Sequence, residues 1–556
     1  MKKIKIAFVN PPSIDTELFS PMTWIWMKSY YDNFGKYKDL VEWLEPPFKY
    51  NRYQSCKEIW EEVNTADIIL YSSYIWNTDI IDEVARLAKN INPNIVNVLG
   101  GPQIGQKDID IFKKKTMYDY FCQVTKPGEL FMQDFIDSYF ENNGIPNIED
   151  ISFELRSTKC REWQFPNVCA YEENFDYLKK IKDYADIEGI FPHVLIETTR
   201  GCPFHCTYCE WGGGIGTKVL KKPEDIVIRE IDVLHKLGYK QIYNVDANFG
   251  LFLERDLFFL KYAYDLGMSF INSSLFKTTN LDKKIKIIDE IFKITGTDTS
   301  NGRKSIVPNI GIQSLSDNAM KISKRVDLNK IDKIQLIEYC EKNFGASSPF
   351  MEFIRAMPGS TLDDFYDELL VIYNSLENNN IQYCFYDYMA LPDSEITDDL
   401  YCALNKIKLV EVFTQTVEEG ISFISSGLYK NRKNYFKTIS SCNSYTLEDN
   451  IQMFIMSFAS DTLVRKLWKN LKDVLPDVRT FLEYCWTAMN NISSFKEIYN
   501  DVKDTLNYET AAKDITKING KNRLEIIEEF INSNEQLIYN NLFEEIVEYG
   551  SNNQAN

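Results

Sequence analysis

This sequence has no long apolar runs, carries no net positive charge and contains few histidines. No stretch of about 20 apolar residues is present, so we predict no membrane-spanning helix. The N-terminal MKKIKIAFVNPPS has an apolar run of only about five residues after its lysines, which is too short for a signal peptide. Lys and Arg number 62 against 81 Asp and Glu, which gives a net charge of −19. Such an acidic chain matches phosphate-rich surfaces poorly, so we expect neither nucleic acid nor an anionic membrane as a partner.

Cysteine is more abundant than histidine. The chain has twelve cysteines and three histidines, His193, His205 and His235. Because no export signal or membrane anchor is evident, we expect a cytoplasmic protein, and cytoplasmic thiols stay reduced. The cysteines are therefore better explained as ligands, catalysts or core residues than as disulfides.

The first 140 residues alternate predicted strands with a predicted helix. Residues 5–10, 66–76, 94–102 and 118–130 are apolar segments bounded by turn residues, and 80–91 is an amphipathic helix. This order predicts a doubly wound, Rossmann-like parallel sheet, which binds ligands at the carboxyl ends of its strands. The loops at those ends are residues 10–13, 74–77, 100–102 and 128–129.

Residues 190–395 have a more regular period, in which six predicted strands alternate with five predicted helices. The strands are 193–199, 241–246, 268–275, 309–314, 350–356 and 381–390, and the helices are 223–237, 255–266, 283–295, 329–343 and 361–377. This α/β pattern predicts a partial (β/α)6 barrel, although a doubly wound sheet is also compatible with it. We interpret 141–189 as a linker with local helix and 396–556 as a helical C-terminal domain.

Three cysteines fall within RGCPFHCTYCEWGGG (200–214), in the loop after the first barrel strand. Active sites form at that end of a parallel barrel. Three thiolates from one short loop, Cys202, Cys206 and Cys209, can each ligate one iron of a 4Fe-4S cluster. A zinc site would more often add a second CxxC pair or histidines, so the cluster is favoured. The glycines that follow permit a close backbone approach and predict a loop that passes over the cluster.

The CxxxCxxC spacing, with Tyr208 just before the third cysteine, resembles the signature of the radical S-adenosylmethionine (SAM) superfamily. Three cysteines leave one iron without a protein ligand. The resemblance implies that this iron binds the amine and carboxylate of SAM. It also implies that an electron from a donor such as flavodoxin or ferredoxin cleaves SAM to a 5′-deoxyadenosyl radical, which abstracts hydrogen from the substrate.

The same resemblance implies further SAM contacts. Most family members carry Gly-Gly-Glu after the second barrel strand, whereas this chain has Asp246-Ala-Asn-Phe-Gly250, so Asp246 and Asn248 are the candidates there. Family members also place polar side chains at the ends of later strands. The corresponding cofactor-binding candidates, together with Tyr208, are Ser274, Gln313, Ser314 and Glu352.

A doubly wound domain ahead of such a barrel resembles the cobalamin-binding architecture of the superfamily. Asn10-Pro11-Pro12, GGP at 100–102 and PGEL at 127–130 carry this resemblance. The usual motif Asp-x-His-x-x-Gly is missing, and the first 190 residues contain no histidine to serve as a lower axial ligand. Because some members bind cobalamin without one, cobalamin binding stays open against a vestigial domain that recognises substrate.

Three functions follow from these motifs. ETTRGCPFHCTYCEW, SSYIWN (72–77) and VDANFG (245–250) resemble proteusin-type enzymes that mature ribosomal peptides, which implies a peptide epimerase. An epimerase returns hydrogen from a thiol, and Cys384 and Cys402 are the candidate catalytic donors. The alternatives are a cobalamin-dependent radical SAM methyltransferase and a non-catalytic iron–sulfur or zinc scaffold. The partner is then a peptide or small-molecule substrate, with an electron donor for either enzyme.

Overall fold

The computed structural model describes most of the 556 residues. The described ranges are 3–11, 17–19, 21–47, 55–105, 114–122, 127–147, 163–189, 191–209, 218–272, 274–296, 309–345, 349–375, 382–392, 394–415 and 433–553. No helix within these ranges is both long enough and apolar enough to cross a bilayer.

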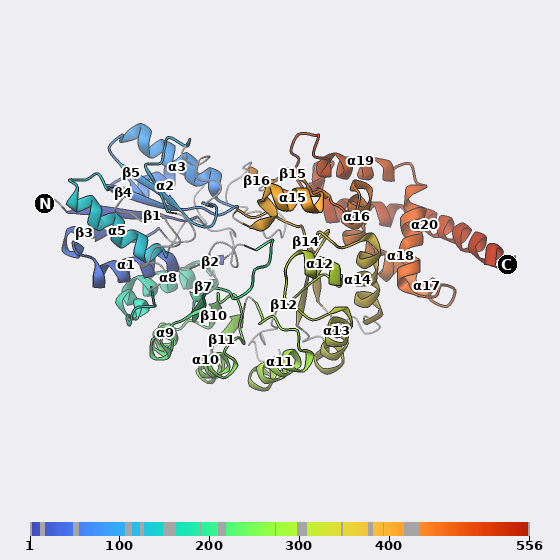
Figure 1. Cartoon of the computed structure of the whole chain (residues 1–556), viewed down its shortest axis with the longest axis horizontal. Coiled ribbons are helices and arrows are strands. Elements are labelled where there is room, and N and C mark those ends of the chain that lie inside the picture. The colour runs from blue at the N-terminus through green and yellow to red at the C-terminus, as the bar shows by residue number, and fades with distance from the viewer. Residues whose placement is uncertain are drawn as a thin grey trace.

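A five-stranded parallel sheet forms the N-terminal domain (Figure 1). Its strand order is β3-β1-β4-β5-β6. The strands are β1 (Ile4–Val9), β3 (Val41–Trp43), β4 (Ile68–Ser72), β5 (Val96–Gly100) and β6 (Tyr120–Phe121), and the helices are α1 (Met22–Phe34), α2 (Cys56–Val63), α3 (Thr78–Ile91) and α5 (Gly128–Glu141).

Alternate residues of β1 enter two separate cores. Ile6 and Phe8 join the core that contains α1 and α5, whereas Ala7 and Val9 join the core that contains α2 and α3. All five residues of β4 are buried, because helices cover both faces of the sheet. The predicted doubly wound sheet is therefore confirmed.

Two N-terminal expectations differ from the structure. The segment 66–76 is a strand only over β4, and the segment 118–130 is a strand only over β6, with α5 already starting at Gly128. Helix α1 was not predicted, because Trp24, Ile25, Trp26 and Met27 are all buried and hide the polar face that marks an amphipathic helix.

The barrel consists of two parallel sheets of short strands, and its helices form the lower rim in Figure 1. One sheet has the order β11-β10-β7-β2 and the other β12-β13-β14. The strands are β2 (Glu17–Phe19), β7 (Phe191–Ile196), β10 (Gln241–Asn244), β11 (Ser269–Asn272), β12 (Asn309–Gln313), β13 (Phe350–Ile354) and β14 (Tyr383–Tyr386). The intervening helices are α9 (Glu224–Lys236), α10 (Leu253–Asp265), α11 (Leu281–Thr295), α13 (Lys330–Phe344) and α14 (Leu362–Ser375).

Each of the six predicted barrel strands and five predicted barrel helices has a counterpart within a few residues, so the partial barrel is confirmed. The strand β2 was not predicted. It pairs in parallel with β7, and this pairing joins the N-terminal segment to the edge of the barrel.

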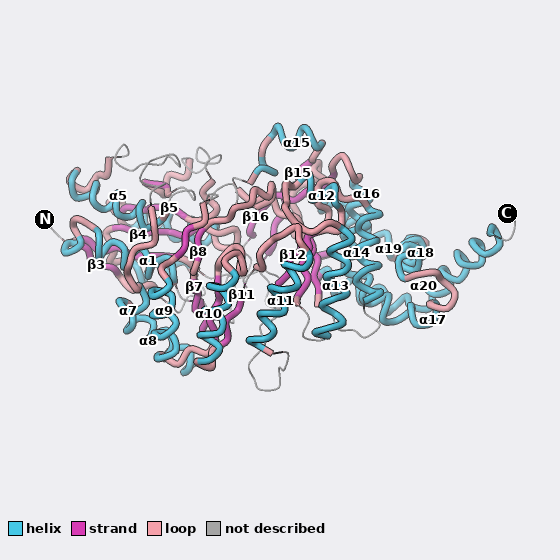
Figure 2. Tube along the Cα trace, turned by 60° about the horizontal axis from the view of Figure 1, so that its bottom comes forward, coloured by secondary structure: helices cyan, strands magenta, loops and turns pink. Residues whose placement is uncertain are grey.

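The C-terminal part is mainly helical, and Figure 2 shows its helices at the opposite end of the molecule from the N-terminal sheet. Its main helices are α16 (Leu447–Leu463), α18 (Val478–Asn490), α19 (Phe495–Leu506) and α20 (Arg523–Asn553). The region 141–189 contains α7 (Ala170–Glu173) and α8 (Phe175–Glu188), in keeping with a linker that holds local helix. The domain boundaries themselves stay a prediction.

An antiparallel pair of strands, β15 (Lys408–Gln415) and β16 (Lys433–Ser441), lies within the predicted helical region 396–556, where strand signals in the sequence are sparse. Buried Val410 and Val412 flank exposed Glu411, an alternation typical of a strand that the helical composition of the region obscured. Strand β16 contacts α3 of the N-terminal domain, so this pair lies between the two ends of the molecule.

Candidate functional site

The cysteine loop starts directly after β7, at the carboxyl end of the first barrel strand. Two short antiparallel strands, β8 (Thr199–Arg200) and β9 (Leu220–Lys221), close its base. The Lys222 backbone N–H also donates to the Thr198 carbonyl at 2.9 Å. The predicted glycine loop over the cluster, 212–216, lies outside the described residues.

The three thiols have an environment suited to anionic sulfur. Cys202 and Cys206 are buried and Cys209 is half-buried. Asn248 Nδ2 donates to Cys202 Sγ at 3.2 Å, and Lys277 Nζ donates to Cys206 Sγ at 3.7 Å. Donors aimed at the sulfurs stabilise the thiolate and tune the potential of an iron–sulfur cluster. The donor set therefore fits a 4Fe-4S cluster.

No group of three or more His, Cys, Asp or Glu among the described residues is arranged to hold a single metal ion. A 4Fe-4S cluster does not need such a group, because each thiolate binds its own iron.

Asp246 follows β10, and its carboxylate is turned onto the start of the cysteine loop. It accepts hydrogen bonds from Thr198 N at 2.7 Å, from Thr199 N at 2.9 Å and from Thr198 Oγ1. Burial raises the pKa of this carboxyl, while the hydrogen bonds from Thr198 and Thr199 oppose the rise. Its carboxylate thus holds the loop that carries the thiols, and a direct SAM contact for Asp246 stays a prediction.

Tyr208 connects the cysteine loop to β12 through Arg325, a residue that the sequence did not single out. Arg325 Nη1 donates to Tyr208 Oη at 3.0 Å, its Nε donates to Asp327 Oδ2 at 2.7 Å, and its Nη2 donates to the Gly311 carbonyl. A Cβ at Gly311 would lie 2.5 Å from Gln313 Nε2 and 3.3 Å from Arg325 Nη2, so glycine leaves room for both side chains beside the strand. An isolated arginine in a polar segment carries no motif, so sequence alone gave no signal for it.

Two buried amide oxygens lie at the carboxyl ends of barrel strands. Asn248 Oδ1 and Gln313 Oε1 have no hydrogen-bond partner among the described residues. Gln313 also adopts a φ of 63°, where non-glycine residues are uncommon. A buried acceptor without a partner costs about 1–3 kcal/mol. Both side chains are therefore suited to accept hydrogen bonds from a bound molecule, which fits their predicted contact with SAM.

The remaining SAM-contact candidates have partners within the barrel. Ser314 Oγ donates to Glu368 Oε1 at 2.6 Å. Glu352 accepts from Asn309 Nδ2 at 3.2 Å, and burial raises the pKa of Glu352. Ser274 is half-buried, and its carbonyl accepts from Phe249 N at 2.9 Å. The structure places all three at the rim or interior of the barrel, and their contact with SAM stays a prediction.

Glu368 on α14 gives a pH-dependent prediction. Burial raises its pKa to about 8, so the folded protein keeps a proton that the unfolded chain releases at lower pH. Protonated Glu368 therefore contributes its full stabilisation below the ordinary glutamate pKa. This contribution to the free energy of unfolding is lost as pH rises through about 8. Between pH 5 and pH 8 the free energy of unfolding should fall by up to about 1.4 kcal/mol per pH unit from this group.

Glu368→Gln should remove this pH dependence of the unfolding free energy, measured by urea denaturation at a series of pH values. Glu338→Gln, at an exposed position, should leave the pH dependence unchanged. The same pH dependence of the unfolding free energy in wild type and Glu368→Gln would show that Glu368 is not the group responsible.

The two candidate hydrogen donors have different surroundings. Cys384 lies on β14 opposite Glu352 of β13, and burial raises the pKa of its thiol to about 12, so it stays protonated at neutral pH. Cys402 lies on α15 (Asp399–Asn405), where its Sγ donates to the Ile396 carbonyl at 3.1 Å. Only Cys384 is thus carried by a barrel strand.

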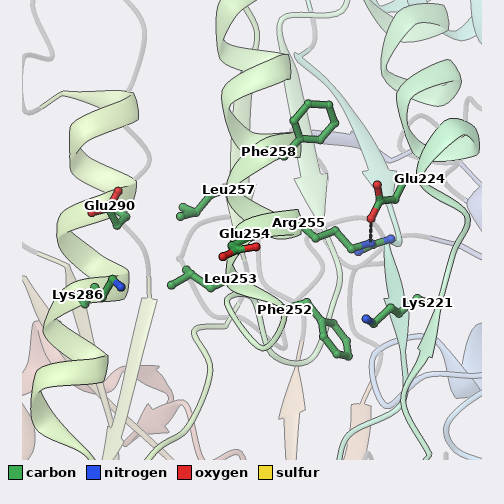
Figure 3. Close-up of a pocket in the computed structure, with 10 residues that line it drawn as sticks. All are labelled: Lys221, Glu224, Phe252, Leu253, Glu254, Arg255, Leu257, Phe258, Lys286 and Glu290. Carbon is green, nitrogen blue, oxygen red and sulfur yellow. Dashed lines mark ion pairs between the residues drawn. The ribbon is translucent and has the colours of Figure 1, made fainter.

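A pocket of about 820 Å³ lies between α10, α11 and β9 (Figure 3). Figure 3 shows Lys286 and Glu290 on α11 facing Leu253 and Leu257 on α10, and Arg255 paired with Glu224 at 3.7 Å. None of its lining residues belongs to the candidate cofactor set, so this pocket is separate from the cysteine site.

The carboxyl edge of the N-terminal sheet is tightly organised. Asn77 Nδ2 lies within hydrogen-bond distance of Asn10 Oδ1 at 3.3 Å and of the carbonyls of Pro11 and Ser72, both at 3.1 Å. Gly101 has a φ of 99°, and a Cβ there would lie 2.6 Å from the Ser73 backbone. The half-buried rings of Tyr74 and Trp76 stack at 4.6 Å between centroids. Flat aromatic faces at this edge suit a planar macrocycle.

Comparisons with known proteins agree with the motif and the fold. No family model matches the chain. It is 23% identical over 261 residues to the cobalamin-dependent radical SAM methyltransferase TokK of Streptomyces tokunonensis, which is 46% of this chain and 37% of TokK. The match thus spans little more than a third of that relative. TokK is named as an enzyme of the class that the cysteine spacing resembles. The chain is similar to the radical SAM superfamily in its cysteine motif and, over this stretch, in its sequence.

Solved structures share the fold of this chain over nearly its whole length. The cobalamin-dependent SAM radical enzyme OxsB, with aqua-cobalamin bound, superposes with a TM-score of 0.55 at 13% identity, over 98% of this chain and 80% of OxsB. TsrM of Kitasatospora setae, with cobalamin and a 4Fe-4S cluster bound, gives 0.53 at 12% identity, over 96% of this chain and all of TsrM. The predicted barrel with a cobalamin-binding-like domain is therefore confirmed, whereas the narrower peptide-maturing branch stays a prediction.

Proposed function

We propose that this chain is a cobalamin-dependent radical SAM methyltransferase. The observation that carries the proposal is the combination of the thiol site at the barrel rim with a doubly wound domain whose carboxyl edge presents Asn77 and the stacked pair Tyr74 and Trp76. Relatives and fold neighbours with cobalamin in their names support this alternative better than the peptide epimerase.

The residues divide the work of binding between the two domains. Cys202, Cys206 and Cys209 would hold the 4Fe-4S cluster, and the free oxygens of Asn248 and Gln313 would orient SAM. Tyr74 and Trp76 would pack against cobalamin. When bound, the cluster supplies the electron that cleaves SAM, and cobalamin supplies a carrier for the methyl group. The substrate is a small molecule or a peptide, and a reduced flavodoxin or ferredoxin would serve as electron donor.

Cobalamin retention tests this proposal. Reconstituted protein mixed with hydroxocobalamin and passed through a desalting column should keep the corrin absorbance at one equivalent per chain. Trp76→Ala should weaken retention by about fivefold, because stacking against one aromatic face contributes roughly 1 kcal/mol. Phe34→Ala, an exposed aromatic on α1, is the matched control. Wild-type protein that shows no corrin absorbance after desalting would reject the proposal.

A peptide epimerase is the second candidate, and Cys384 is the observation that favours it. A thiol that returns a hydrogen atom must stay protonated, and burial of Cys384 has that effect. Turnover of a peptide substrate in heavy water should place one deuterium at the Cα of a D-residue, and Cys384→Ala should abolish that product. A product that has only gained methyl groups would exclude epimerisation.

A further inference from the structure

Arg200 lies two residues before Cys202 and is bound between two carboxylates from different parts of the molecule. Its Nε and Nη2 donate to Glu197 at 2.9 and 2.7 Å, and its Nη1 and Nη2 donate to Glu129 at 3.2 and 3.0 Å. Glu197 follows β7 of the barrel, whereas Glu129 lies in the first turn of α5 in the N-terminal domain. One guanidinium therefore joins the cysteine loop to both domains.

Aromatic rings shield this ion pair from water. The Trp163 and Phe165 rings lie 4.8 and 5.0 Å from the Arg200 guanidinium carbon. The Glu129 side chain is 5% exposed and the Glu197 side chain 7% exposed. Bidentate arginine–carboxylate pairs are directional, and removing one partner of such a buried pair is costly. The arrangement thus holds the loop in one orientation.

Glu129 occupies a place where it can respond to the N-terminal domain. Helix α5 begins next to the carboxyl edge of the sheet, where Gly101 and Asn77 also lie and where doubly wound sheets bind their ligands. Any shift of α5 on ligand binding would move the carboxylate that Arg200 holds.

We propose that Arg200 and Glu129 form a positioning clamp, which fixes the cysteine loop relative to the N-terminal domain and transmits cobalamin binding to the cluster site. Both act through the cysteine loop and are positioning residues. The transmission half of the inference rests on the proposed cobalamin-dependent function, whereas the positioning half does not.

Hydrogen exchange of the full-length reconstituted protein separates these two halves. Without cobalamin, Glu129→Gln should raise amide exchange across residues 198–209 by about tenfold, because a charge-assisted bond to a fixed partner is lost. Arg200→Lys, which keeps the charge and loses the bidentate geometry, should act in the same direction. Glu172→Gln breaks the exposed ion pair with Arg229 and should leave 198–209 unchanged.

Hydroxocobalamin then tests transmission. Wild type should show lower exchange over 198–209 when hydroxocobalamin is added, whereas Glu129→Gln should keep the corrin absorbance and show no such change. Unchanged cobalamin-free exchange in Glu129→Gln would overturn the clamp. Equal protection of 198–209 in both proteins would overturn transmission. Wild type that fails to retain cobalamin would overturn transmission and the proposed function together, and the cobalamin-free comparison would still decide the clamp.

Discussion

Alanine at Cys202, Cys206 or Cys209 should abolish both the 4Fe-4S cluster and the reductive cleavage of SAM. Each thiolate binds a separate iron, so the loss of any one leaves too few protein ligands to hold the cluster on the loop. Iron and sulfide should fall from about four of each per chain to near zero, and 5′-deoxyadenosine formed with dithionite in the absence of oxygen should fall at least about 100-fold.

Cys169→Ala is the matched control, because Cys169 is a buried cysteine outside the loop. It should keep full iron content and full 5′-deoxyadenosine formation. A variant with all three loop cysteines replaced that still forms 5′-deoxyadenosine would refute the assignment of the cluster.

Asp246→Ala should release the cysteine loop. The change leaves the N–H groups of Thr198 and Thr199 and the Thr198 hydroxyl without their buried acceptor. Each unpaired group costs about 1–3 kcal/mol, so the free energy of unfolding should fall by about 3 kcal/mol or more. Because the loop is no longer held, most of the iron should be lost on gel filtration after reconstitution.

Asp256→Ala provides a matched comparison. Asp256 is also a buried carboxylate that accepts two backbone hydrogen bonds, from Gly250 N and Phe252 N, but neither belongs to the cysteine loop. It should lower stability and keep more iron than Asp246→Ala. If Asp246→Ala instead keeps its cluster and loses only affinity for SAM, then Asp246 is a cofactor contact, as the family resemblance implies, and the positioning account is wrong.

The barrel could be predicted from sequence because its strands and helices are short, regular and punctuated. Gly238, Gly267 and Gly296 follow α9, α10 and α11 and mark where each helix ends. The thiol site could be predicted because its three ligands lie within eight residues. Side-chain partners that are distant in sequence could not be predicted, since Arg200 meets Glu129 and Tyr208 meets Arg325 only once the chain is folded.

Segments with a uniform or mixed pattern gave weaker signals. Helix α1 is buried on several sides, so its period is hidden, and β15 is a single alternating stretch within a helical region. Residues 246–250 depart from the family pattern, and the structure shows Asp246 bonded to the loop rather than directed to an open site. The departure in sequence therefore coincides with a structural role for that carboxylate.

The fate of the SAM methyl group tests the central claim most directly. Reconstituted protein with hydroxocobalamin, dithionite and SAM labelled in its methyl group should be incubated without oxygen, and the label should then be followed into the protein-bound corrin. The label should appear there, and Trp76→Ala should lower its amount. Formation of 5′-deoxyadenosine with all of the label still in SAM or methionine would contradict a cobalamin-dependent methyltransferase.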